Sequence, residues 1–316
     1  MKRYVLLALL AALLVGLCAT TATASIGITF DGKPDTLEDK SRAMAVSSTD
    51  DYLNEGDIIF GLVRIDNNIT PGQQVQISDN LAEIIVAFAA KITAMTTVTA
   101  DKKYVEYTLG VAPGFLAGQL TAHPGIGNND MFAVLVMPEP APDPTFYDST
   151  QAYQILNNTH PSISSSFTLF ASGTLGDDDY FKARLWDRDT DPGIKLAKNA
   201  SGDITGIPEY AGLPITAQVG SELVGATYSF LPPGIVVASK VPLVRYDQTI
   251  SWHDIALDAR LFPASFGGEV DDGWLFTDSS IMETNLVPEP ASVVCWLCLG
   301  GLALAGYAAR RRKPVA

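Results

Sequence analysis

Hydrophobic and polar positions divide this chain into three regions with different patterns. Residues 4–17 form an apolar run near the N-terminus, and residues 291–309 form a run of 19 residues without a charge near the C-terminus. Between these runs, apolar residues alternate with polar ones or stand in short stretches bounded by Gly, Pro, Asn and Asp. Alternation with a period of two is typical of β-strands, so the middle region is predicted to be mainly β.

Residues 25–287 are long enough for one large domain or two smaller ones. Residues 81–98 are ambiguous, because their alanine content suits a helix whereas alternating Ile, Val and Phe favour a strand. A short helix is predicted at residues 149–157, with Ser149 as its N-cap. We therefore expect a sandwich-like, mainly β domain with a few short helices. Other strands are predicted at residues 57–65, 74–77, 104–109, 131–137, 167–170, 180–186, 223–230, 235–237 and 241–246.

The first 24 residues have the pattern of a secretory signal peptide. Lys2 and Arg3 precede the apolar run, and residues 22–24 read Ala-Thr-Ala, a small-x-small cleavage pattern. Ser25 is therefore the expected first residue of the exported protein.

The last 29 residues combine three features in a fixed order. Residues 288–290 read Pro-Glu-Pro, the uncharged run 291–309 follows, and residues 310–313 read Arg-Arg-Arg-Lys. A helix of 19 residues spans about 28 Å, close to the hydrocarbon thickness of a bilayer. The cations are expected to stay in the cytoplasm. We predict a transmembrane helix at 291–309 and a basic cytoplasmic tail at 310–316; an ordinary membrane anchor has the same pattern.

This tripartite tail resembles the PEP-CTERM sorting signal of Gram-negative surface proteins. The resemblance implies that Pro288, Glu289 and Pro290 are recognised by exosortase, a membrane-embedded protease that removes the helix. These three residues would act as substrate and catalyse nothing. The prolines also suit an extended segment that stays outside the helix and open to a protease. The family is associated with exported polysaccharide, which makes an extracellular polysaccharide a candidate partner.

Charge and cysteine content narrow the possible partners of the exported region. Of the 21 Lys and Arg residues, two lie in the signal peptide and four in the C-terminal tail, which leaves 15 for the exported region. Against the 35 Asp and Glu residues, this gives a net charge near −20. Nucleic acid and anionic lipid are poor partners for such a surface. The cysteines, Cys18, Cys295 and Cys298, all lie outside residues 25–287, so no disulfide is expected there.

One acidic segment is a candidate Ca²⁺ site. Asp187, Asp189 and Asp191 place carboxylates at alternate positions, and oxygen ligands of this kind suit Ca²⁺. The segment departs from an EF-hand loop, because Pro192 replaces the expected glycine and Lys198 replaces the expected bidentate glutamate. An acidic turn without metal explains the same residues.

Catalytic patterns are poor in this sequence. His253 and Asp254 are adjacent and would supply half of a catalytic triad, but no G-x-S-x-G motif supplies a nucleophile. The simplest interpretation of Trp186, Trp252 and Trp274 is that they pack in the hydrophobic core.

We therefore predict a non-catalytic protein of the cell surface or extracellular matrix. The alternatives are an exported polysaccharide hydrolase with an Asp or Glu pair, and a Ca²⁺-dependent adhesion module.

Overall fold

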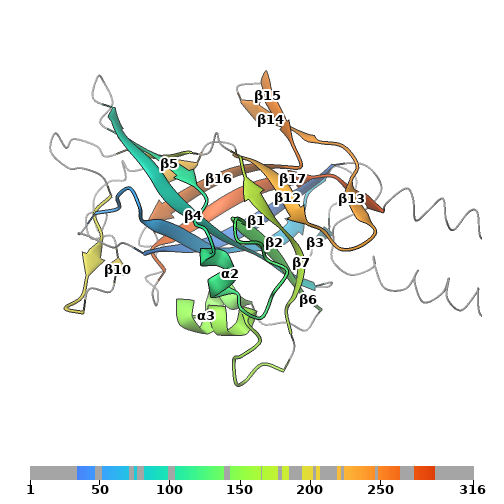
Figure 1. Cartoon of the computed structure of the whole chain (residues 1–316), viewed down its shortest axis with the longest axis horizontal. Helices are drawn as coiled ribbons and strands as arrows, with labels where there is room; N and C mark the ends of the chain where they lie inside the picture. Colours follow the sequence, from blue (N-terminus) through green and yellow to red (C-terminus); the bar gives the residue numbers. More distant parts are fainter. Residues whose placement is uncertain are drawn as a thin grey trace, which may run out of the picture.

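The computed structural model confirms a mainly β protein (Figure 1). It describes residues 34–46, 52–70, 75–76, 82–98, 104–138, 143–164, 166–176, 180–184, 194–201, 204–206, 219–221, 224–245, 248–263 and 274–288. The predicted signal peptide and the predicted transmembrane helix both lie outside these residues. Within the described part, none of the helices has the length and apolar character needed to cross a membrane.

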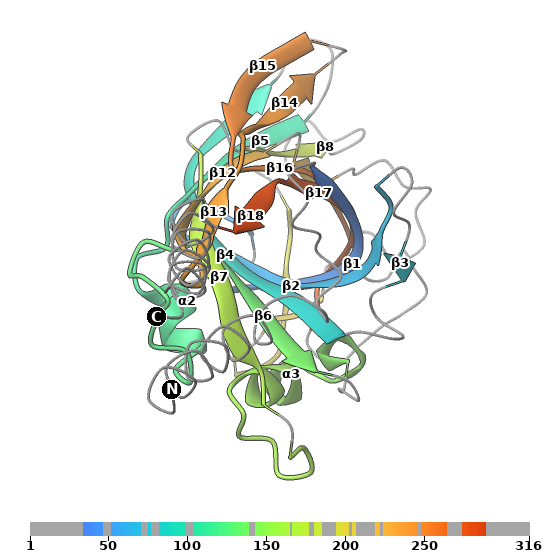
Figure 2. The same cartoon turned by 90° about the vertical axis from the view of Figure 1, so that its right-hand side faces the viewer.

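Eight antiparallel strands close into a barrel-like ring (Figures 1 and 2). The predicted sandwich is therefore wrong in architecture. A sandwich has two separate sheets with open edge strands, whereas here β2 pairs with β4 and closes a single sheet on itself. Around the ring the order is β4 (Ala82–Val98), β6 (Phe132–Pro138), β7 (Thr168–Leu175), β12 (Val224–Phe230), β16 (Ile255–Pro263), β17 (Phe276–Thr284), β1 (Asp35–Val46) and β2 (Ile58–Asn68).

Strand β4 is long enough to take part in two parts of the sheet. Its first half pairs with β6 and β2, and its second half pairs with β5 (Tyr104–Gly110) after a register shift between Ile92 and Ala94. Strands β8 (Tyr180–Arg184) and β11 (Val219–Ser221) continue from β5 and return to β16. The remaining short strands are β3 (Val75–Gln76), β9 (Ala197–Lys198), β10 (Ile204–Gly206), β13 (Ile235–Val237), β14 (Val241–Arg245), β15 (Gln248–His253) and β18 (Leu286–Pro288).

Among the described residues, three short helical segments lie outside the sheet: α2 (Phe115–Gln119), η1 (Pro144–Phe146) and α3 (Ser149–Leu156). Helix α3 confirms the predicted helix but begins with a different cap. The carboxylate of Asp148 accepts a hydrogen bond from the Gln151 N–H, so Asp148 is the N-cap and Ser149 is the first helical residue.

Alternate side chains of β6 enter two different hydrophobic clusters. Ala133, Leu135 and Met137 pack in the cluster that also contains buried residues of α3. The side chains between them, such as Val134, pack in a cluster to which all eight ring strands contribute, and this cluster forms the interior of the ring. Burial on both faces explains why residues 131–137 form an uninterrupted apolar run instead of alternating with polar residues.

Candidate functional site

Strand β18 fastens the start of the predicted sorting signal to the folded domain. It pairs antiparallel with β13, and Pro288, Val287 and Leu286 lie opposite Ile235, Val236 and Val237, in that order. Leu286 is 0% exposed and joins the interior cluster that the ring strands form. Figure 1 shows β13 at the right-hand end of the ring, and Figure 2, which faces that end, shows β13 at the left side of the ring with β18 beside it, nearer the middle.

A chain of polar contacts fixes the two residues that precede β18. Thr284 donates a hydrogen bond to the Asp254 carbonyl (3.2 Å), so the hydroxyl of Tyr228 is the donor in its 2.9 Å contact with Thr284. Burial raises the pKa of Tyr228, which keeps the phenol protonated. Asn285 donates to Ser239 Oγ (2.8 Å), and its carbonyl accepts the N–H of Ala238. Residues 284–288 are therefore held by hydrogen bonds as well as by burial.

Pro288 lies in a strand, which differs in part from the expected open segment. A proline has no N–H, but it can stand at the end of a short edge strand because its carbonyl is still available as an acceptor. Glu289 and Pro290 lie outside the described residues. The folded domain thus extends into the Pro-Glu-Pro motif and includes its first residue.

A mainly β domain whose last strand runs into a polar motif, an uncharged run and a basic cluster is the arrangement of an exported protein with a C-terminal sorting signal. The family model that matches this chain is the PEP-CTERM protein-sorting motif, over residues 286–313. The match begins at the first residue of β18 and supports an exported protein sorted by exosortase, a membrane protein. Searches of curated proteins and of solved structures returned no match to the chain.

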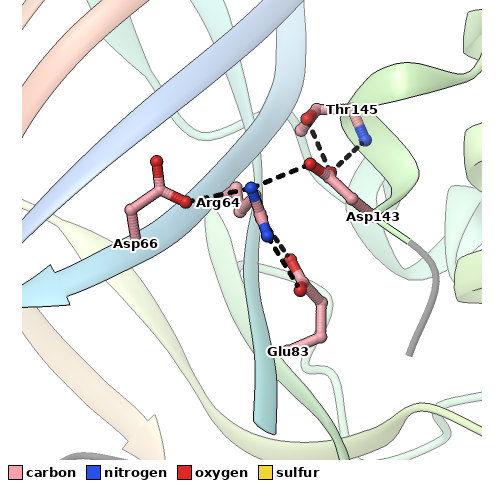
Figure 3. A network of polar contacts seen from close by, with 5 residues as sticks. All are labelled: Arg64, Asp66, Glu83, Asp143 and Thr145. Carbon is pink, nitrogen blue, oxygen red and sulfur yellow. Dashed lines mark hydrogen bonds and ion pairs between the residues drawn. The ribbon is translucent and has the colours of Figure 1, made fainter. Parts of the chain in front are cut away.

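An arginine with three carboxylate partners forms the main charged cluster that the structure describes (Figure 3). The guanidinium of Arg64 on β2 lies 2.7 Å from Glu83 on β4, 3.2 Å from Asp66 and 3.0 Å from Asp143. The second oxygen of Asp143 accepts hydrogen bonds from the N–H and hydroxyl of Thr145, at the first turn of η1. The cluster therefore connects two ring strands to the segment that leads into α3.

The charges of this cluster favour a structural role for Arg64. Burial lowers the pKa of Arg64, but the hydrogen bond with Glu83 and the charges of Glu83, Asp143 and Asp66 raise it more, so the pKa lies above its ordinary value. This cluster could not be recognised in the sequence, because residues 64, 83 and 143 belong to segments that no motif connects.

The predicted Ca²⁺ ligands Asp187, Asp189 and Asp191 lie outside the described residues, so that site stays a prediction. In the part of the chain that the structure does describe, no group of three or more His, Cys, Asp or Glu side chains is arranged to hold a metal ion.

His253 and Asp254 do not form the catalytic pair that their adjacency suggested. The Nε2 atom of His253 lies 2.8 Å from the hydroxyl of Ser251, but the carboxylate of Asp254 binds Lys240 (3.0 Å) and the N–H of Tyr228 (3.3 Å). Asp254 lies in the bend between β15 and β16, where its carboxylate faces Lys240 and Tyr228 and not the imidazole. Among the described residues, no carboxylate orients this imidazole as a base.

An open depression of about 390 Å³ lies beside α3. Thr150, Gln119 and Gln154 supply hydroxyl and amide groups to its wall, and the buried rings of Phe60 and Tyr153 lie beneath. None of the described residues that line it is charged. The hydroxyl of Tyr153 is buried without a hydrogen-bond partner among the described residues, and burial raises its pKa. The chemistry of this lining suits an uncharged ligand rich in hydroxyl groups.

Proposed function

We propose that this chain is a non-catalytic protein of the cell surface or extracellular matrix that exosortase processes after export. The observation that carries the proposal is the direct junction between domain and sorting motif, where β18 is both the last described strand and the first part of the motif. A protease that cuts beyond Pro288 releases the complete ring, because no strand of the ring lies downstream of β17. Processing therefore frees a folded domain from its tail.

The second Pro-Glu-Pro copy, at residues 138–140, provides a matched control for the role of the motif. In a host that has exosortase, we expect Glu289→Ala to leave the protein at its precursor mass in the membrane fraction. Glu139→Ala should be processed like the wild type, because no apolar run follows that copy. Equal processing of wild type and Glu289→Ala would contradict recognition through the motif.

The proposed non-catalytic role rests on the environment of the polar groups. Arg64 engages the carboxylates of its cluster, and in the part of the chain that the structure describes no carboxylate orients the imidazole of the Ser251–His253 contact. The depression beside α3 offers hydroxyl and amide groups without a charged side chain, which favours binding of a neutral saccharide over its hydrolysis. An extracellular polysaccharide is accordingly the proposed partner.

One panel of neutral oligosaccharides tests binding and hydrolysis together. We expect binding that Gln154→Ala weakens several-fold and that Gln248→Ala, on the distant strand β15, leaves unchanged. Binding is measured by ligand-observed NMR, and hydrolysis by the release of reducing ends. Turnover of any oligosaccharide would replace this proposal with the hydrolase alternative, and absence of binding across the panel would remove the saccharide partner.

A further inference from the structure

Exposed apolar side chains gather on one small element of the protein. Among the described residues, the large apolar side chains that are most exposed are Trp252 (59%), Ile250 (55%), Val46 (46%), Ile281 (43%) and Val244 (41%). Three of them belong to the antiparallel hairpin that β14 and β15 form. The hairpin projects from the body of the sheet in both views (Figures 1 and 2).

The two faces of this hairpin differ in what covers them. Val241 and Leu243 are buried on the inner face and form a small cluster with Ala256 of β16. Trp252 lies directly opposite Pro242, and Thr249 lies opposite Val244; Ile250 is the unpaired residue between them, where the register shifts, and Trp252 and Ile250 are both exposed. The outer face therefore carries Pro242, Val244, Ile250 and Trp252 together with the polar Thr249; none of these side chains is charged, and we call this set the outer apolar face.

The base of the hairpin is held in a fixed position. Lys240 directly precedes β14 and Asp254 directly follows β15, and their side chains form an ion pair at 3.0 Å. The same carboxylate accepts the N–H of Tyr228 on β12. His253 packs so closely over Gly225 that a Cβ there would overlap its ring. These contacts keep the inner face on the sheet and the outer apolar face away from it.

Short connections join this hairpin to the sorting signal. Val241 follows Ile235, the residue of β13 that lies opposite Pro288, by six residues, which span at most about 21 Å when extended. Strand β13 pairs with β18, and Pro288 precedes the uncharged run 291–309 by three residues, at most about 11 Å. Insertion of that run into a bilayer therefore leaves the lipid surface within reach of the hairpin.

We propose that the outer apolar face rests on the lipid surface while the C-terminal tail anchors the unprocessed protein. This inference depends on the proposed function, because it needs the tail in the membrane. Tryptophan favours the interface between hydrocarbon and water, and none of the residues named for this face carries a charge that contact with lipid would desolvate. The tether makes the contact intramolecular, so a small patch is sufficient. Removal of the tail ends this advantage and lets the domain leave the membrane.

Quenching of tryptophan fluorescence by brominated lipid tests this contact. The unprocessed protein, purified from membranes of a host without exosortase, is reconstituted in phosphatidylcholine vesicles with bromine near the headgroup end of the acyl chains. Trp296 reports insertion of the tail, and Trp252 reports the hairpin. We expect bromine to quench the fluorescence of the wild type. The quenched fraction should be smaller in Trp296→Phe, and it should also be smaller in Trp252→Phe. Ile250→Ser should reduce the Trp252 contribution several-fold, whereas Val46→Ser on β1 should not.

Each other outcome overturns a distinct part of the inference. Quenching of Trp296 alone, with Trp252 still open to aqueous acrylamide, means that the tail inserts but the hairpin does not touch lipid. Protection of Trp252 from both quenchers that increases with protein density means that a second copy covers the face. Absence of Trp296 quenching means that the tail does not insert, and the anchoring in the proposed function fails together with this inference.

Discussion

Arg64 is the residue on which the charged interior of this protein depends. Its guanidinium offsets carboxylates from β2, β4 and the segment before η1, and Glu83 is among the least exposed charged residues described. Removing one member of a buried ion pair costs more than the pair contributes, because the other member stays buried and unpaired. The cluster thus stabilises the fold only as long as it is complete.

Arg64→Met is expected to lower the free energy of unfolding by about 3–5 kcal/mol, because it removes the cation that Glu83, Asp66 and Asp143 share. Equilibrium denaturation in urea measures the change. Lys182→Met is the matched control, since Lys182 and Glu106 form a more exposed cross-strand pair at 3.5 Å whose loss should cost less than about 1 kcal/mol. Similar losses in both variants would contradict the special role of the Arg64 cluster.

Tyr107 makes the stability of the protein sensitive to pH in the alkaline range. Burial raises its pKa to about 12, while its oxygen accepts the N–H of Ile194. The folded state therefore keeps this proton at a pH where the unfolded state, with a pKa near 10, loses it. Stability should be complete below pH 10 and should decrease as pH rises from 10 to 12. Tyr107→Phe should reduce this slope in urea denaturation at pH 9, 10 and 11; an unchanged slope would contradict the assignment.

At the scale of elements, the attachment of β18 depends on one apolar side chain. Leu286 belongs to the interior cluster, whereas its neighbour Val287 is only half-buried. Leu286→Ala is expected to lower the free energy of unfolding by about 2–5 kcal/mol through the cavity that it leaves. Val287→Ala should cost clearly less, and both are measured by chemical denaturation. If Leu286→Ala were neutral, β18 would not be part of the core.

Sequence patterns predicted elements well where both the period and the boundaries were distinct. The predicted strands at 57–65 and 131–137 correspond to β2 and β6, and the ambiguous segment 81–98 is the strand β4. Strand β1 was missed, because its sequence DTLEDKSRAMAV is polar through most of its length. Trp252 was wrongly assigned to the core, since the pattern of a hairpin does not tell which of its faces will be covered.

At the scale of the whole molecule, ring closure depends on contacts that no local pattern contains. Strand β1 lies between β2 and β17, and β17 begins more than 200 residues after β1 along the chain. Alternation specifies that a strand has a buried face, but it does not specify which strand lies beside it. The Arg64 cluster and the burial of Leu286 could not be predicted from the sequence for the same reason, whereas the sorting motif could, because its parts are contiguous.

The position of β18 also bears on how the sorting motif meets its protease. Because Pro288 is paired with Ile235, the segment available for cleavage begins at the edge of a folded domain. The mature protein should therefore keep β18 and with it the residue that fills the interior of the ring. The ring needs no refolding when the tail is removed.

Mass spectrometry of the mature C-terminus, on protein isolated from its own cells, tests the central claim most directly. The account predicts a chain that ends shortly after Pro288, retains Leu286 and lacks residues 291–309. A chain that continues to Ala316 in cells that contain exosortase would contradict the account, since the tail would then be a permanent anchor and not a processed sorting signal.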